Sequence, residues 1–151
     1  MTPTPETVEL ENALKHGGVH AALRWLNART PHRYTGIYRF DGAMLRNVHL
    51  FDRFEPDVQV GSDAPMAATF CAMVGRSGGA LEIADAARET RFPVLPVTPV
   101  ISYCGALIRD EHGEPYGTLC HYDTLPCEQR TSDIPLLEAA TPLIYARIRS
   151  R

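Results

Sequence analysis

Four cysteines are the residues of this chain best suited to covalent chemistry, because a thiolate is a nucleophile and two thiols can exchange electrons by forming a disulfide. They are Cys71, Cys104, Cys120 and Cys127, and no two of them form a C-x-x-C pair. The first ten residues, MTPTPETVEL, have no basic or apolar stretch of the kind that directs export. We therefore expect a reduced compartment, the cytoplasm, and no disulfide framework.

Two of these cysteines lie on either side of a turn in residues 102–124, SYCGALIRDEHGEPYGTLCHYDT, which predicts a β-hairpin. A type I turn closed by a left-handed Gly113 gives a three-residue loop with a bulge. That loop places Cys104 directly across from Cys120 on one face of the sheet. A loop one residue shorter or longer puts the two sulfurs on opposite faces, so this prediction depends on the register.

The sequence leaves the role of these thiols open between small apolar core residues, redox-active groups and ligand contacts. Cys120 is not activated by its neighbour His121, because adjacent residues of a strand point to opposite faces. Cys71 follows Pro65 near the start of a predicted short helix, where backbone dipoles favour a thiolate. If the protein has redox chemistry, we expect Cys71, Cys104 and Cys120 to carry it.

Composition favours one ordinary globular domain. The chain has 151 residues, of which 44% are hydrophobic and 22% charged, and it can bury roughly two-thirds of its unfolded surface around one core. Its net charge of −3 provides no basic field for a phosphate backbone, so we expect no nucleic-acid partner. No apolar stretch is long enough to span a membrane. We assign residues 1–6 to a flexible leader and residues 7–151 to the domain.

The predicted elements follow the order helix, two strands, short helix, strand, irregular crossing, hairpin and helix. Apolar residues at helical spacing predict a helix near residues 7–28, interrupted by two glycines, and another over residues 133–149. The proline-rich segment 93–100, PVLPVTPV, can neither pair within a sheet nor continue a helix, so it must cross the surface or line a cleft. Strands between terminal helices predict an α+β fold, with an antiparallel sheet covered by those helices.

Several of these segments resemble a GAF domain, a small-molecule sensor module related in shape to PAS domains. The resemblance spans residues 19–149 and rests on RYTGIYRFDGAML, TFCAMV, EIADAARETRF, YCGALIRDEHGEPYGTLCHYDTLP and PLLEAATPLI. It implies a six-stranded antiparallel sheet with the terminal helices on one face. On the other face it implies a pocket roofed by the short helix and the proline-rich crossing. Members of this family bind cyclic nucleotides, bilins, haem, 2-oxoacids or small anions, so the resemblance names no ligand.

The resemblance also implies a set of pocket residues. The first hairpin, the roof and the last hairpin would supply Tyr38, Phe51, Phe70, Cys71, Val74, Tyr103, Cys104, Cys120 and Tyr122. Arg39 and Arg91 are the basic residues nearest this region and would hold a carboxylate or another anion with a bidentate guanidinium. We therefore predict a small-molecule-binding sensor that signals through a partner protein or through a homodimer formed by its terminal helices.

Two alternatives follow from the same resemblance. The free methionine-R-sulfoxide reductases are stand-alone GAF domains with thiol chemistry, and Cys71 falls close to where they keep a resolving cysteine. The segment that holds their nucleophile is matched by residues 91–102, RFPVLPVTPVIS, which contain no cysteine, and residues 117–122, GTLCHY, lack their two pocket carboxylates. A haem-binding sensor is the other alternative, with the iron held by one of the histidines at positions 16, 20, 32, 49 and 112, or alternatively by Cys71 or His121.

Bilin attachment and metal binding find little support in the residue pattern. Covalent bilin attachment in related photoreceptors uses a Cys-His pair on a helix, whereas Cys120-His121 lies in a predicted strand. His16 and His20 have the spacing that puts two imidazoles on one helical face, but two glycines separate them and no third ligand follows. We predict no metal site, and the sequence does not identify a cofactor.

Overall fold

The computed structural model describes residues 4–127 and 133–149, which form one α+β domain. In chain order the elements are α1 (Pro5–Asn27), β1 (Tyr34–Asp41), β2 (Met44–Asp52), β3 (Ala64–Pro65), the 3-10 helix η1 (Met66–Ala68), α2 (Cys71–Ser77), β4 (Leu81–Ile83), the 3-10 helix η2 (Ala86–Arg88), β5 (Ser102–Arg109), β6 (Pro115–Asp123) and α3 (Ile134–Arg149).

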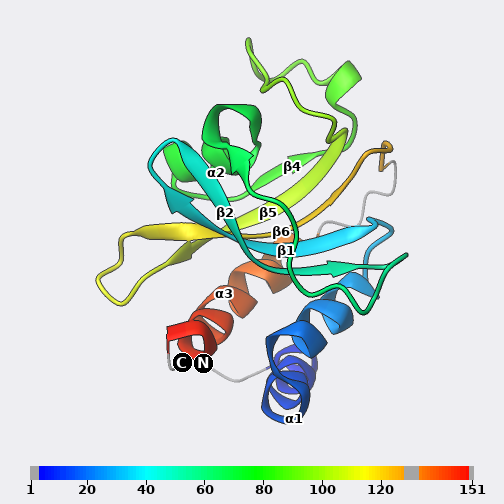
Figure 1. Ribbon diagram of the computed structural model, residues 1–151, viewed down its shortest axis with the longest axis vertical. Helices are drawn as coiled ribbons and strands as arrows, with labels where there is room; N and C mark the ends of the chain where they lie inside the picture. Colours follow the sequence, from blue (N-terminus) through cyan, green and yellow to red (C-terminus); the bar gives the residue numbers. More distant parts are fainter. Residues whose placement is uncertain (1–3, 128–132, 150–151) are drawn as a thin grey trace.

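The strands form a single antiparallel sheet of six, in the order β3-β2-β1-β6-β5-β4. The terminal helices α1 and α3 lie together on one side of this sheet, and the short helix α2 lies on the other (Figure 1). This arrangement confirms the predicted fold class. The very short strand β3 has no clear signal of its own in the sequence.

The sheet separates two apolar clusters. The larger cluster lies between the sheet and the terminal helices and includes Ile37 and Leu119. The smaller cluster lies on the α2 side and includes Val74 and Ile83. Because successive side chains of a strand point to opposite faces, the strand register decides which residues join which cluster.

The N-terminal helix α1 is bent at the glycines where the sequence predicts an interruption. The hydroxyl of Thr4 caps its first turn by accepting a hydrogen bond from the Thr7 backbone nitrogen. Gly18 has φ 78° and ψ −167°, a conformation that glycine adopts without steric cost. The helix begins at Pro5. None of the helices in the described part of the chain is long and apolar enough to cross a membrane.

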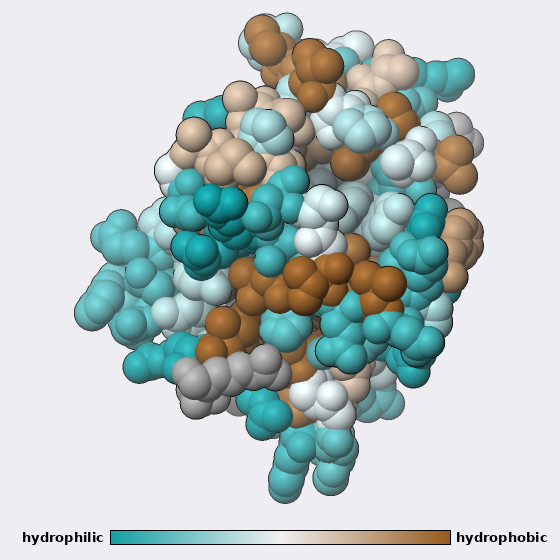
Figure 2. Space-filling model, viewed as in Figure 1, coloured by the Kyte–Doolittle hydropathy of each residue, from teal (hydrophilic) through white to brown (hydrophobic). Residues whose placement is uncertain are grey.

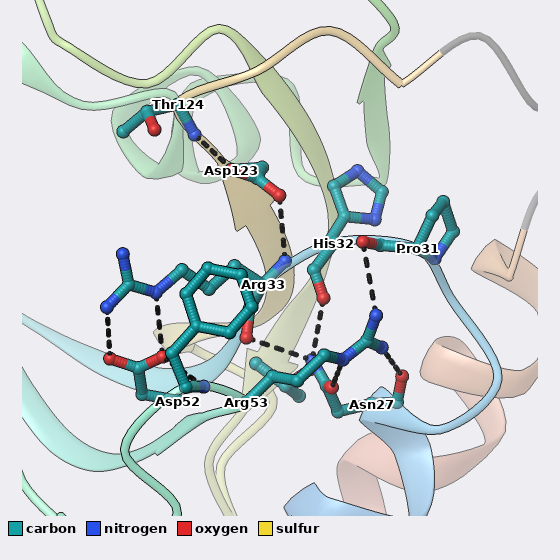
Figure 3. Close-up of polar contacts among 10 residues, drawn as sticks. Asn27, Pro31, His32, Arg33, Asp52, Arg53, Asp123 and Thr124 are labelled. Carbon is teal, nitrogen blue, oxygen red and sulfur yellow. Dashed lines mark hydrogen bonds and ion pairs between the residues drawn. The ribbon is translucent and has the colours of Figure 1, made fainter.

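A polar network ties the C-terminal end of α1 to the ends of three strands (Figure 3). Arg53 donates to the backbone oxygen of Asn27 at 2.7 Å and to its side-chain oxygen at 3.0 Å. Arg33 forms a bidentate pair with Asp52 at 2.8 and 2.9 Å, and its backbone nitrogen donates to Asp123 at 2.9 Å. The network satisfies carbonyl groups at the end of the helix and fixes the helix against β1, β2 and β6.

The hairpin that joins β5 and β6 has the predicted loop followed by an additional bulge. Gly113 is left-handed, with φ 79°, and the loop spans residues 111–113. The register then shifts by one residue between Ile108 and Arg109, where Tyr116 is the extra residue of β6. A bulge of this kind leaves one residue of the longer strand unpaired.

This bulge changes the positions of the two cysteines. Cys104 pairs with His121, and Gly105 pairs with Cys120. Cys104 consequently belongs to the cluster under the terminal helices, whereas Cys120 belongs to the cluster under α2. The prediction that Cys104 lies directly across from Cys120 is therefore wrong.

Candidate functional site

A cavity of about 310 Å³ lies on the sheet face opposite the terminal helices. Its wall on the sheet side is formed by side chains of β1, β2, β5 and β6. The rest of the lining comes from three short segments, residues 62–65, 68–71 and 98–100. The last of these belongs to the proline-rich crossing, which passes over the cavity as the family resemblance implied.

Apolar surface continues from this crossing to the outside of the molecule. The segment between η2 and β5 lies at the top of Figure 1, and Figure 2 shows hydrophobic side chains gathered in the same place. Val94 and Val97 in this segment are 79% and 93% exposed. The segment thus covers the cavity with its last residues and leaves Val94 and Val97 in solvent.

Six of the sequence-derived candidates line the cavity together. They come from β1, the start of α2, β5 and β6, and they are Tyr38, Phe70, Cys71, Tyr103, Cys120 and Tyr122. The structure therefore brings two of the four cysteines and three tyrosines to one site.

Three candidates that were placed in the pocket lie elsewhere. Phe51 packs on the helix side, with its ring 5.6 Å from the ring of His20 in α1. Cys104 also faces the helix side, because of the bulge described above. Val74, which belongs to α2, is fully buried but does not line the cavity.

The two arginines expected to hold an anion are also outside the cavity. Arg39 points to the opposite face of β1 from Tyr38 and lies 3.9 Å from the carboxylate of Asp41. Arg91 forms a close ion pair with Glu89, at 2.8 Å. In the described part of the chain no basic side chain lines the cavity, so the predicted anion clamp is not formed.

Hydroxyl groups supply most of the polarity of the cavity wall. The phenol groups of Tyr38 and Tyr122 hydrogen-bond to each other, and the ring of Tyr122 stacks on Tyr34 with 4.9 Å between centroids. Burial raises the pKa of Tyr38 well above its usual value, and burial raises that of Tyr122 as well. Both phenols therefore stay neutral at physiological pH and act as hydrogen-bonding groups.

The sulfur of Cys71 lies among several hydrogen-bond donors at the cavity wall. The Thr118 hydroxyl donates to it at 3.0 Å, and the Tyr103 hydroxyl lies 3.3 Å away. The Thr118 hydroxyl is also 4.0 Å from the sulfur of Cys120, and the thiol of Cys120 donates to the backbone oxygen of Gly36 at 3.8 Å. Sequence reasoning missed Thr118, although its position two residues before Cys120 puts both side chains on one face of β6.

These contacts make the three buried thiols chemically different. Burial raises the pKa of Cys71, but its polar neighbours Cys120, Thr118 and Tyr103 outweigh burial and lower it overall. Burial, together with the neighbouring Cys71, raises the pKa of Cys120 well above its usual value. Burial on the helix side raises the pKa of Cys104 to about 12. Cys71 is therefore the one of these three thiols whose surroundings lower its pKa.

His121 lies on the other face of β6 and does not reach the cavity. Its Nδ1 is 2.7 Å from the hydroxyl of Thr35, and its Nε2 is 3.0 Å from the carboxylate of Asp133. Both ring nitrogens are thus engaged, and the side chain is fully buried. His121 cannot act as an iron ligand in the cavity, and it cannot assist a bilin attached to Cys120.

The remaining cofactor hypotheses also meet structural obstacles. No histidine lines the cavity within the described ranges, so imidazole-ligated haem does not fit it. His16 and His20 lie on either side of the non-helical Gly18. Across residues 4–127 and 133–149 no group of three histidine, cysteine or acidic side chains is arranged to hold a metal ion.

This combination of sheet order, terminal helices and cavity is that of a GAF-type domain, and comparison with solved structures agrees. The GAF domain of an Acinetobacter phosphoenolpyruvate-protein phosphotransferase matches with a TM-score of 0.69 and 11% identity, over 99% of this chain and 96% of that one. Free methionine-R-sulfoxide reductase from Neisseria meningitidis, solved with its substrate, matches with a TM-score of 0.67 and 12% identity, over 99% and 94%. The type II enzyme from Thermoplasma acidophilum matches with a TM-score of 0.62 and 15% identity, over 93% and 96%.

The protein therefore has a GAF-like fold. No family model and no curated protein matches the sequence. At such low identities the structural likeness shows the fold alone, and it includes both sensor domains and reductases.

Proposed function

We propose that the protein is a sensor module of the GAF type that binds a compact, uncharged and mostly apolar small molecule. The observation that carries this proposal is the cavity of about 310 Å³ on the sheet face that the terminal helices leave open. Its volume is at the small end of the range of roughly 300–1,000 Å³ that is typical of ligand pockets.

The charges of the cavity wall support an uncharged ligand. Asp63 is the one charged side chain that lines the cavity in the described part of the chain. Its carboxylate already accepts hydrogen bonds from Arg46 at 3.1 Å and from the Asn47 backbone nitrogen at 2.8 Å. Aromatic rings and neutral hydroxyl groups make up much of the remaining surface. A neutral molecule with one or two hydrogen-bonding groups matches this surface better than an anion does.

We expect Ala68→Trp to abolish ligand binding, because residue 68 lines the cavity and an indole fills much of its volume. The test is a thermal-shift screen of the purified protein with indole, benzamide and similar neutral aromatic compounds, and with acetate and nitrate as charged comparisons. A compound at 100 times its dissociation constant stabilises the protein by about 2.7 kcal/mol. That stabilisation should be lost in the variant.

Ala67→Trp is the matched control for this experiment. Ala67 belongs to the same 3-10 helix but is exposed and does not line the cavity. This control should keep the full ligand-induced shift. Equal shifts in both variants, or a response to the anions alone, would contradict a neutral ligand in this cavity.

The sensor proposal also requires a route from the cavity to a partner. Cys120 and Tyr122 line the cavity, while His121 between them holds Asp133, the residue before α3. A ligand that moves β6 therefore acts on the start of α3. We propose that α1 and α3 carry the signal, through a homodimer or a separate partner protein, and light scattering with and without ligand tests the homodimer.

Reduction of free methionine sulfoxide is the second candidate function, and one observation favours it: Cys71 and Cys120 lie together at the cavity. Among the residues that the structure describes, no basic group lines the wall to hold the substrate carboxylate, and Asp63 is already paired. Incubation with free methionine-R-sulfoxide and dithiothreitol tests this function. Methionine formation that disappears in Cys71→Ser would favour the reductase over the sensor.

A further inference from the structure

We propose that Cys71 and Cys120 form a peroxide-reactive dithiol, in which Cys71 reduces a small uncharged hydroperoxide that enters the cavity and Cys120 then closes a disulfide. This inference goes beyond ligand sensing, because it assigns a redox activity to the cavity wall. It also does not depend on the identity of the sensed molecule.

The geometry brings the required groups to one place. Cys71 is at the start of α2, and Cys120 is in the middle of β6, so the two sulfurs approach each other from the roof and the floor of the cavity. Both sulfurs contact the Thr118 hydroxyl, at 3.0 and 4.0 Å. Disulfide formation needs side-chain rotations that bring the two sulfurs to about 2.05 Å from each other.

The surroundings of Cys71 favour its reaction with a peroxide. The hydroxyl groups of Thr118 and Tyr103 lie 3.0 and 3.3 Å from its sulfur, and such donors stabilise the thiolate. The thiolate is the nucleophilic form of cysteine. The same donors lie where a leaving hydroxide or alkoxide must take up a proton.

The reaction balances in two steps. The Cys71 thiolate attacks the hydrogen-bearing oxygen of the hydroperoxide, the O–O bond breaks, and the alkoxide or hydroxide leaves and takes up a proton as alcohol or water. Cys71 is then a sulfenic acid. The Cys120 thiol displaces its hydroxyl group, so that a Cys71–Cys120 disulfide and water form. Two electrons pass from the thiol pair to the peroxide, and an external dithiol restores the reduced pair.

The lining of the cavity selects a hydroperoxide over an amino-acid sulfoxide. A free amino acid carries a carboxylate and an ammonium group, and both need charged or strongly polar partners when they are buried. The described cavity wall offers no basic side chain, and its one carboxylate is already paired with Arg46. Hydrogen peroxide and small alkyl hydroperoxides have no charge and meet no such requirement.

Peptide mapping of the oxidised protein tests the proposal. The folded protein is treated with hydrogen peroxide or with cumene hydroperoxide, alkylated, and digested for mass spectrometry, with free methionine-R-sulfoxide as a third arm. We expect loss of both thiols and a peptide that links Cys71 to Cys120. Cys120→Ser should stop at a Cys71 sulfenic acid that dimedone traps, and Cys71→Ser should leave Cys120 reduced.

Three further variants separate this reaction from general thiol oxidation. Cys104→Ser and Cys127→Ser should still form the disulfide, because Cys104 faces the helices and Cys127 lies outside the cavity. Thr118→Val removes a donor to Cys71 and should slow sulfenic acid formation without loss of the folded near-ultraviolet circular dichroism spectrum.

Several results would overturn the inference. One is a Cys71 that reacts with hydrogen peroxide no faster than Cys127 in the folded protein. Another is a disulfide that joins a different pair of cysteines. A linked Cys71–Cys120 peptide that forms with methionine sulfoxide but with neither peroxide would overturn the peroxide inference and support reduction of methionine sulfoxide instead.

Discussion

Gly117→Ala is expected to lower the free energy of unfolding by about 3 kcal/mol or more, because the added methyl group has no space. A Cβ atom at this position would lie 1.8 Å from the backbone oxygen of Tyr38 and 3.0 Å from the Cα of Arg39. Both atoms belong to β1, which pairs with β6 at this point. The two central strands of the sheet would have to separate before the side chain fits.

Urea unfolding, followed by circular dichroism, measures this effect. For a domain of this size a loss of 3 kcal/mol corresponds to a fall in melting temperature of about 6–12 °C. Gly79→Ala is the matched control, because a Cβ there meets no atom within 4 Å. It should change the free energy of unfolding by less than about 0.5 kcal/mol. A Gly117→Ala protein as stable as this control would show that β1 and β6 do not pair as described.

The bulge beside Gly117 shows why the fold could be predicted from the sequence while part of the site could not. Helical spacing and glycine turns identified the helices, the two long hairpins and their order. The register of β5 and β6 depended on one more residue, Tyr116, which forms the bulge beside Gly117. An isolated glycine within a strand is a known sign of a bulge. The predicted register follows from the hairpin loop alone and does not include this bulge. Cys104 was therefore assigned to the wrong face.

The arginines illustrate a different limit of sequence reasoning. Arg39 and Arg91 were chosen because they are basic and close to the expected pocket. Each has an acidic residue two positions away, Asp41 and Glu89, and each pairs with that neighbour. A long, flexible side chain can pair with an acidic residue nearby in the chain instead of reaching into a pocket. A set of pocket residues inferred from a family resemblance does not take such local ion pairs into account.

The thiol site could be found only from three-dimensional contacts. The sequence suggested a reactive Cys71 because it lies at the start of a helix. In the structure the relevant donors are the hydroxyl groups of Thr118 and Tyr103, and Cys120 lies at the same cavity, so all three come from distant strands. None of them is adjacent to Cys71 in sequence, so only the folded sheet shows that these groups meet.

The polar contacts on the helix side of the sheet also arise from residues far apart in the chain. His32 lies in the turn after α1, where exposure to solvent is the usual outcome, yet its side chain is buried. Its Nδ1 is 2.6 Å from the Thr30 hydroxyl, and its ring stacks on His121 with 5.9 Å between centroids. Its Nε2 is buried without a hydrogen-bond partner in the described part of the protein. A proton on this ring would therefore be poorly accommodated.

We expect this histidine to make the protein lose stability as the pH falls from about 6.5 to about 4. Burial is the largest of the causes that together lower the pKa of His32 from 6.5 to about 4; His121 and Arg53 add to the lowering, whereas Asp123 and Asp133 oppose it. The unfolded chain takes up a proton near pH 6.5, but the folded protein does so only near pH 4. Above pH 6.5 the histidine is neutral in both states and has no effect on the pH dependence. Below that value the unfolded state is favoured by up to about 3 kcal/mol.

Comparison of His32→Phe with the wild type isolates this contribution. Phenylalanine keeps a flat ring that can stack on His121 but has no nitrogen to protonate. Urea unfolding at a series of pH values should show that the variant loses about 3 kcal/mol less than the wild type between pH 6.5 and pH 4. His112→Phe, which changes a side chain that is 78% exposed in the β5–β6 loop, is the matched control. If His32→Phe and the wild type lost stability in parallel, His32 would not be the acid-sensitive group. The loss would then come from groups that both proteins contain, such as the carboxylates of this network.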